Sequence, residues 1–332
     1  MKRKFFVSAM AAIAMFACEK KEECAPLLSD GDLSVLKVKM VSEQTKVTGQ
    51  GSEEEKSIAG YQILVYDMKS RTLEAYATPT AGSEEVSMQC RTGKKEVIVL
   101  ANAPDVTNIL SYDDFVEVRS YLSDNNVGGL VMEGHASPEL TIAGETVSVD
   151  LKRMVSKIIL DEISVDFEND AYDSKDFILK EVYLTNVAGD LTYMAENADP
   201  VKWYNKSVRI SNDDVDAMIF DTMKDFNMKG NAEYTDSHHF YCYPNPYVED
   251  SFMSDDWTPR PTRLVVEAML DGELFYYPVV MPKLERNTKY HVSLNIVRPG
   301  ATSPEQDMDK YAASFKITVL DWQESENISE TI

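Results

Sequence analysis

The stretch RLVVEAMLDGELFYYPVVM, residues 263–281, contains two apolar runs joined through Asp271-Gly272. Both runs are rich in valine, leucine, tyrosine and phenylalanine, as β-strands commonly are. Asp-Gly is a preferred central pair of the type I′ turn, because both positions of that turn need a positive φ. The stretch therefore predicts a β-hairpin, and the same pattern of short apolar runs between turn residues recurs through the chain.

Apolar runs of strand length lie on both sides of this hairpin. They are LSVLKVKM (33–40), YQILVY (61–66), EVIVLA (96–101), TVSVDL (146–151), SKIILDEISVDF (156–167), FILKEVYLTN (177–186), YHVSLNIV (290–297) and ASFKITVLDW (313–322). Helical spacing is limited to 113–122 and 213–226, where we expect helices set into loops. No internal repeat of fixed period is evident. Many strands without βαβ alternation predict an all-β fold, mainly β with short helices, built as antiparallel sandwiches.

Length and charge limit the classes of function. A chain of 332 residues is long enough for two domains, and we place their boundary at Leu151-Lys152, between two apolar runs. The formal net charge is −23. Such a chain is repelled by nucleic acid, because binding to a polyanion depends on clustered lysine and arginine. The same charge disfavours direct adsorption to anionic lipid.

The N-terminus carries a secretory signal. Lys2, Arg3 and Lys4 precede a short apolar run from Phe5 to Phe16, and the sequence turns charged directly after Cys18. The run is too short to cross a bilayer as a helix. A cysteine after a small residue at this position is typical of a lipoprotein signal, in which Cys18 becomes the acylated N-terminus. The alternative is an ordinary signal peptide that is cut nearby.

Motifs for catalysis or for cofactor binding are missing from the sequence. The four histidines have no metal-ligand spacing, and neither a nucleophile elbow nor a glycine-rich phosphate loop is found. Acidic doublets such as Asp113-Asp114 fit helix N-termini or solvated loops better than a carboxylate pair. Cys90 and Cys242 lie in strand-like runs, which favours small buried side chains, although a disulfide between them stays open. We therefore expect no enzyme activity, cofactor or metal.

The run LSVLKVKM has the alternation of a half-buried strand. Leu36, Val38 and Met40 share one face, with Ser34 in phase. The following segment, 42–57, is polar, contains two glycines and has no apolar periodicity. We therefore expect a strand followed by a flexible loop.

The chain resembles the fimbrillins, the lipoprotein-precursor subunits of type V pili, over nearly its whole length. The resemblance rests on a series of motifs in order: the signal ending at Cys18, LSVLKVKM, GYQILVYD (60–67), EVIVLANAP (96–104), GLVMEG (129–134), VSVDLKRMVSKI (147–158), YCYPN (241–245), TRLVVEA (262–268), YYPVVMPKLERNTKYHVSLNIVRPG (276–300) and FKITVLDW (315–322). It implies two tandem transthyretin-like antiparallel β-sandwich domains, and a structural role in a pilus that supports cell adhesion.

The resemblance also implies a processing route. Residues 1–18 are the signal peptide, 19–46 a propeptide that contains the displaceable first strand, 47–151 the N-terminal domain and 152–332 the C-terminal domain with its tail. The precursor is exported to the outer membrane and anchored through lipid on Cys18. A trypsin-like protease then cuts the 42–57 loop at Lys46-Val47, with Lys56 as the fallback. The loss of Leu36, Val38 and Met40 opens a groove, and the subunit polymerises into a surface fimbrium by donor-strand exchange.

The expected donor strand departs from this scheme. In the family it follows the last strand, where this chain has QESENISETI (323–332). Ile328 and Ile332 share a strand face with three glutamates, and burial of those carboxylates is unfavourable. The donor register therefore either extends back to Leu320 and Trp322, or the chain is not an ordinary shaft subunit.

The alternative is an uncleaved outer-membrane lipoprotein of the same fold, acting as a pilus anchor, a tip accessory or a glycan-binding adhesin. Expected partners are other pilin subunits, the processing protease, the outer membrane and a host or microbial surface receptor.

Overall fold

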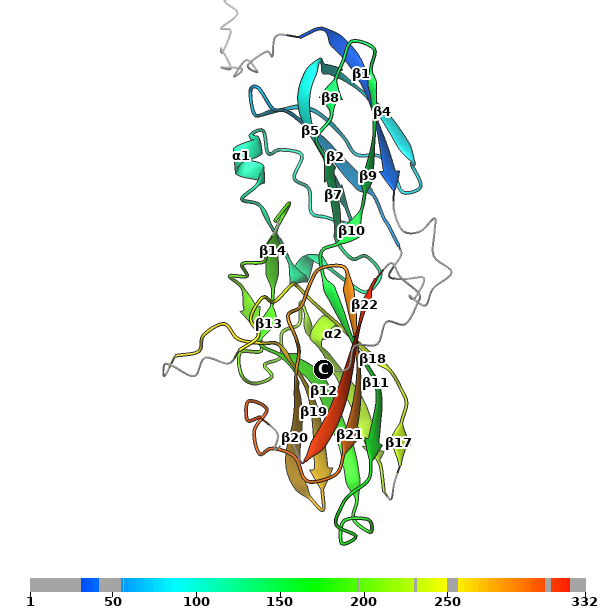
Figure 1. Ribbon diagram of the computed structural model, residues 1–332, viewed down its shortest axis with the longest axis vertical. Helices are drawn as coiled ribbons and strands as arrows, with labels where there is room; N and C mark the ends of the chain where they lie inside the picture. Colours follow the sequence, from blue (N-terminus) through cyan, green and yellow to red (C-terminus); the bar gives the residue numbers. More distant parts are fainter. Residues whose placement is uncertain are drawn as a thin grey trace, which may run out of the picture.

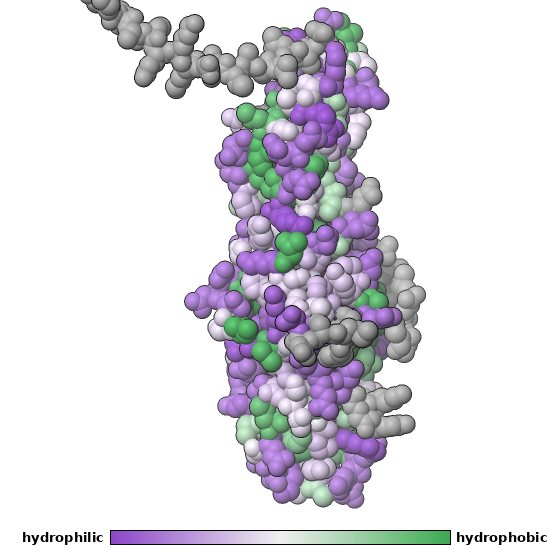
Figure 2. Space-filling model, turned by 90° about the vertical axis from the view of Figure 1, so that its left-hand side faces the viewer, coloured by the Kyte–Doolittle hydropathy of each residue, from purple (hydrophilic) through white to green (hydrophobic). Residues whose placement is uncertain are grey.

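The computed structural model describes residues 31–41, 55, 57–195, 197–229, 232–249, 256–307 and 312–322. They form two β-rich bodies stacked end to end along the long axis of the molecule (Figure 1). On the face shown in Figure 2, hydrophobic surface is confined to separate patches among hydrophilic residues. The expectation of a mainly β protein with short helices is confirmed.

The N-terminal body contains two sheets packed face to face. The smaller sheet has the order β4-β1-β9, with β4 (Glu85–Arg91), β1 (Leu33–Val41) and β9 (Glu145–Asp150). The larger has the order β10-β7-β5-β2-β3, with β10 (Lys152–Arg153), β7 (Met132–Ala136), β5 (Gly93–Ala101), β2 (Tyr61–Asp67) and β3 (Thr72–Ala77); β8 (Glu139–Leu140) also pairs with β5. The chain leaves this body between Arg153, in β10, and Ser156, just beyond the expected boundary at Leu151-Lys152.

The C-terminal body also contains two main sheets. One has the order β17-β11-β21-β22, with β17 (Glu233–Tyr234), β11 (Ser156–Val165), β21 (Thr288–Ile296) and β22 (Ala313–Asp321); β18 (His238–Cys242) also pairs with β11. The other has the order β16-β12-β19-β20, with β16 (Phe220–Asn227), β12 (Phe177–Thr185), β19 (Arg263–Leu270) and β20 (Glu273–Val280). The predicted hairpin at Asp271-Gly272 is confirmed, with φ of 52° and 86°.

Two small sheets complete the described strands. β13 (Val187–Ala188) pairs with β15 (Trp203–Tyr204), and β14 (Asp190–Thr192) pairs with β6 (Arg119–Tyr121). β6 comes before β10, in the N-terminal half of the chain, and β14 comes after β11, in the C-terminal half. Their pairing therefore ties the two bodies together through backbone hydrogen bonds.

The two bodies share one topology, although no repeat period is visible in the sequence. The first strand of each, β1 or β11, pairs antiparallel with one neighbour and parallel with the other. The order β4-β1-β9 matches β18-β11-β21, and β3-β2-β5-β7 matches β16-β12-β19-β20. β22 pairs with β21 and has no counterpart in the N-terminal body, where the sheet ends at β9.

The two helices expected from spacing are much shorter than predicted. The interval 113–122 gives α1 (Tyr112–Phe115), then β6 and the start of a 3₁₀ turn, η3 (Leu122–Asp124), while 213–226 gives α2 (Asp216–Ile219), then β16. The prediction of full helices was wrong there. Short helices are weak without tertiary support, and pairing of β6 with β14 and of β16 with β12 satisfies the same backbone groups.

The buried side chains form two separate clusters. The smaller fills the space between the two sheets of the N-terminal body and includes Leu36, Val38 and Met40 of β1. The larger fills the C-terminal body and extends to the outer face of β2 and β5, where it takes in Leu64 and Ile98. Loss of β1 would therefore disrupt the smaller cluster and leave the larger one in place.

Candidate functional site: the first strand and its groove

β1 is the middle strand of its sheet. It pairs antiparallel with β4, from Leu33 opposite Arg91 to Lys39 opposite Glu85, and parallel with β9 from Leu36 to Val41. Both of its edges are therefore satisfied by ladder hydrogen bonds. If β1 were withdrawn, β4 and β9 would each present an unpaired edge across the vacated position.

The side chains of β1 alternate strictly between core and solvent. Leu36 and Val38 are fully buried, and Met40 and Ser34 are each 8% exposed. The opposite face is exposed and includes Leu33 and Val35. Removal of β1 would leave an apolar groove with β2 and β5 as its floor and Val149 of β9 at its side; the floor includes Ile63, Val65, Val97 and Val99.

Hydrogen bonds at both ends fix the register of β1. The Ser34 hydroxyl donates to the carbonyl of Thr141 at 2.7 Å, and the amide of Leu151 donates to the carbonyl of Val41 at 2.9 Å. The ion pairs of Lys37 and Lys39 with Glu85, at 3.8 and 3.7 Å, are solvent-exposed and contribute little. β1 is therefore held by ladder hydrogen bonds and by apolar burial.

The groove contains a cysteine. Cys90 lies on β4 opposite Ser34 of β1 and is fully buried. Burial raises the pKa of the Cys90 thiol to about 12, with the nearby Glu74 carboxylate acting in the same direction. Cys242 is fully buried in the C-terminal body, and both thiols are free. Cys90 is thus protected by β1, while Cys242 is protected by a core to which β1 does not belong.

The processing and anchoring residues expected from the sequence lie outside the described part of the chain. These are Cys18, Lys46, Val47 and the fallback Lys56, together with Ile328 and Ile332 of the tail.

The other two donor candidates are already incorporated in the C-terminal body. Leu320 lies near the end of β22 opposite Lys289. Trp322 is 4% exposed, and its amide donates to the carbonyl of Asn287 at 3.0 Å. A donor register that included these two residues would require the end of β22 to separate from the rest of its body.

Glu55, in the connection between β1 and β2, makes contacts that were not expected from the sequence. Its carboxylate is buried and accepts hydrogen bonds from Lys157 and from the hydroxyl of Tyr241, the latter at 2.6 Å. Burial alone would raise the pKa of Glu55, but the charge and hydrogen bond of Lys157 outweigh burial and hold that pKa below its usual value. The sequence gives no signal that separates Glu55 from Glu53 and Glu54.

The histidine pair does not form a metal site. His238 is buried, and its ring nitrogens contact Asp221 at 2.7 Å and Tyr234 at 2.8 Å, while His239 points to the opposite, exposed face of β18. Across the described ranges, no group of three or more histidine, cysteine or acidic side chains is placed to hold a metal ion. In the same part of the chain, no helix has the length and apolar character needed to cross a membrane.

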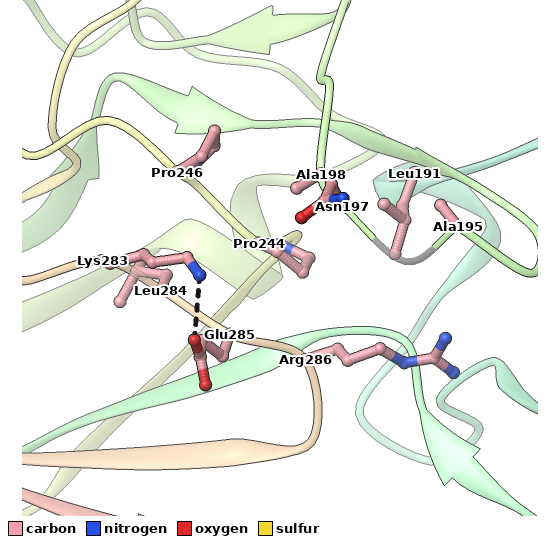
Figure 3. A pocket seen from close by; sticks show the side chains of 10 residues that line it. All are labelled: Leu191, Ala195, Asn197, Ala198, Pro244, Pro246, Lys283, Leu284, Glu285 and Arg286. Carbon is pink, nitrogen blue, oxygen red and sulfur yellow. Dashed lines mark hydrogen bonds and ion pairs between the residues drawn. The ribbon is translucent and has the colours of Figure 1, made fainter.

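A cavity of about 390 Å³ lies near the junction of the bodies (Figure 3). It is lined by Leu191, Ala195, Asn197, Ala198, Pro244, Pro246 and residues 283–286. Lys283 and Glu285 form an ion pair at 3.0 Å, and Arg286 contacts Glu133 of β7 at 3.4 Å. The charged side chains of residues 283–286 therefore pair with one another or with the N-terminal body.

Comparisons with known proteins point to one group. The family model of the major fimbrial subunit protein (FimA) matches residues 33–175, beginning at the first residue of β1. The chain is 22% identical to the major fimbrium subunit FimA type-2 of Porphyromonas gingivalis, and the match covers 97% of each protein.

Two solved structures share the fold. A candidate cell adhesion protein from Bacteroides eggerthii matches with a TM-score of 0.66 at 17% identity, covering 88% of this chain and 97% of that one. A fimbrilin (FimA) from Porphyromonas gingivalis matches with a TM-score of 0.60 at 15% identity, covering 86% of this chain and 96% of that one.

Proposed function

We propose that this chain, a member of the fimbrillin family, is a structural subunit of a cell-surface pilus that assembles by exchange of β1. The family model and the curated relatives support the pilus. One structural observation supports the exchange: a single strand at the N-terminal end of the described chain lies in the middle of a sheet, with four alternate side chains buried.

The first step is export and anchoring. The precursor leaves the cytoplasm through its signal peptide and is held at the outer membrane by lipid on Cys18. The charge of −23 supports an acyl anchor, because the folded surface has little attraction for anionic lipid. The mature domains are residues 47–151 and 152–332, with the change of body a few residues after the second domain begins.

The second step is cleavage at Lys46-Val47. This bond lies in the connection that follows Val41, the last residue of β1. Cutting there separates β1 covalently from the rest of its sheet. Each buried side chain of the size of Leu36 or Val38 contributes about 2 kcal/mol, so the freed strand leaves only when an equivalent strand replaces it or when the precursor opens.

The third step is replacement of β1 by a strand from another subunit. A strand in the vacated position regains ladder bonds to both β4 and β9, each worth about 1 kcal/mol net. The C-terminal body of the acceptor stays folded meanwhile, because the larger apolar cluster does not contain β1. A polymer built this way is durable when release of the donor requires local unfolding.

The C-terminal tail supports the alternative position at an end of the fibre. A donor for this groove needs apolar residues where β1 has Leu36, Val38 and Met40. The tail 323–332 offers Ile328 and Ile332 with Glu330 between them, and its other register is wholly polar. The chain is therefore a better acceptor than donor. A tip or accessory subunit, or an uncleaved anchor or adhesin of the same fold, tolerates such a tail.

N-terminal sequencing of the protein taken from the cell surface tests the proposal. A mature chain that begins at Val47 and is recovered from sheared fimbriae supports a processed subunit. A chain that still begins at lipidated Cys18 and stays in the outer membrane supports the uncleaved alternative. Recovery as a monomer after cleavage contradicts strand exchange.

A further inference from the structure

Glu55 joins the connection between β1 and β2 to the C-terminal body. Its side chain is 1% exposed, and its partners Lys157 and Tyr241 lie on β11 and β18. The backbone carbonyl of Glu55 also accepts a hydrogen bond from Arg153 of β10 at 3.4 Å. A short segment of the N-terminal half is thus held by residues 98 to 186 positions away in the sequence.

Trp322 completes this junction cluster, which consists of Glu55, Arg153, Lys157, Tyr241 and Trp322. The Arg153 guanidinium lies 4.7 Å from the centre of the Trp322 ring, and Tyr241 stacks on that ring at 6.2 Å. All five residues are at most 4% exposed. The rings keep water away from the Glu55–Lys157 pair, so removal of one partner leaves an uncompensated buried charge.

We propose that Glu55 anchors the connection between β1 and β2, and that this anchor confines processing to Lys46 by protecting the bond after Lys56. The proposal rests on the proposed function, because it concerns the choice of cleavage site in the same connection.

Access explains the protection. A protease binds several residues on each side of the bond that it cuts, and it cuts folded proteins where the backbone is exposed. The bond after Lys56 is one residue removed from the buried Glu55. A protease can therefore reach it only after the junction cluster opens, and the cleavage rate then follows the population of the open form.

The consequence of a cut at Lys56 strengthens the argument. Such a cut would release Glu55 with the propeptide and leave Lys157 buried without its carboxylate. A cut at Lys46 keeps Glu55 on the mature chain and leaves the junction cluster intact. Protection of the bond after Lys56 thus also preserves the packing of the N-terminal body against the C-terminal body.

Limited digestion with trypsin tests the anchor, because trypsin cuts after both lysines. The purified full chain is digested, and the new N-termini Val47 and Ser57 are followed by mass spectrometry. A peptide of residues 42–60 gives the intrinsic ratio of the two cuts. The quantity compared is the rate of the cut that exposes Ser57 divided by the rate of the cut that exposes Val47. We expect this ratio to be at least about tenfold lower in the folded chain than in the peptide.

Lys157→Met is the decisive variant, because it removes the partner of Glu55 and leaves the sequence around Lys56 unchanged. We expect it to speed the Ser57 cut about tenfold or more and to leave the Val47 cut unchanged. Lys316→Met is the matched control, since Lys316 is exposed on β22 of the same sheet. Cleavage after Lys95, which is fully buried in the N-terminal body, reports general unfolding.

Two results would overturn the anchor. One is a folded wild-type chain that yields Ser57 as readily as the peptide, and the other is a Lys157→Met variant with an unchanged Ser57 rate. Glu55→Gln checks the same contact from the other side and should speed the Ser57 cut less than Lys157→Met, because the amide still accepts from Tyr241. Neither result depends on polymer formation, so failure of the anchor is distinguishable from failure of strand exchange.

Discussion

Cys90 reports the state of the groove without any engineered label. Cys90 lies on β4 directly opposite Ser34 of β1, and its raised pKa, about 12, adds low reactivity to low access. Because only the smaller apolar cluster involves β1, the two buried cysteines should respond differently to the loss of that strand.

We expect Cys90 to become reactive when β1 leaves. A maleimide at neutral pH should leave Cys90 and Cys242 unlabelled in the precursor. Cleavage followed by displacement of β1 should make Cys90 label at least about tenfold faster, while Cys242 stays protected. Mass spectrometry of peptides resolves the two sites. Equal labelling of both cysteines would indicate general unfolding and would contradict a local groove.

Lys95 forms a buried triad in the same body. Its ammonium lies 2.6 Å from Asp67 and 2.7 Å from Glu74, and it is fully buried. Burial would raise the pKa of Asp67, but hydrogen bonds from Lys95 and Ser70 outweigh burial and hold that pKa below its usual value.

This depressed pKa predicts loss of stability in acid. A carboxyl whose pKa is lower in the folded than in the unfolded chain stabilises the fold above the unfolded value, near 4. That stabilisation is lost as the pH falls through the folded pKa. Urea unfolding from pH 6 to pH 3 should therefore show a shallower decline for Asp67→Asn than for the wild type. Identical slopes would show that Asp67 takes no part.

At the scale of elements, the side chains of β1 alternate between the core and the solvent, and the buried ones complete the apolar core of the N-terminal body. Val38 is fully buried and Val35 is 42% exposed on the opposite face of the same strand. The two positions are chemically identical and differ in burial, which makes them a matched pair.

Val38→Asp should destabilise the N-terminal body by at least about 3 kcal/mol, because it places a carboxylate in an apolar core. Val35→Asp should cost about 1 kcal/mol or less, since its carboxylate stays in water. Urea unfolding measures both, and Cys90 labelling should rise only in Val38→Asp. Similar losses for the two variants would mean that β1 does not pack as described.

Prediction from sequence succeeded where elements are long and strongly patterned. Leu36, Val38 and Met40 share a buried face because period-two alternation is a local property of a strand. The prediction of helices over 113–122 and 213–226 was wrong, because apolar spacing does not show that a partner strand is available. That partner is β14 for the first interval and β12 for the second. Very short strands such as β10 and β13 depend on tertiary contacts and have no pattern of their own.

Glu55 marks the limit of sequence reasoning for the site. It is one of three consecutive glutamates, and its partners lie more than 95 positions away in the sequence. A buried ion pair between distant segments leaves no periodic trace. The buried face of β1 was therefore predictable, and the junction cluster was not.

At the scale of the whole molecule, two bodies of one topology differ in how their first strand is protected. In the C-terminal body, β11 pairs with its parallel partner β21, and a further strand, β22, lies on the other side of β21 in the same sheet. In the N-terminal body, the corresponding sheet ends at β9, and its first strand is joined to the rest by the connection that we expect to be cut. On the proposed function, the C-terminal body persists while the first strand of the N-terminal body is replaced.

A reversible disulfide across β1 tests the central claim most directly. Lys37 and Ser87 lie opposite each other on β1 and β4, with both side chains exposed. The double variant Lys37→Cys, Ser87→Cys should hold β1 in place after cleavage at Lys46. Polymerisation is then followed by light scattering, in the presence of a competent donor subunit, before and after addition of a reductant. We predict that cleaved, oxidised chains stay monomeric and polymerise on reduction; polymerisation with the disulfide intact would contradict the exchange of β1.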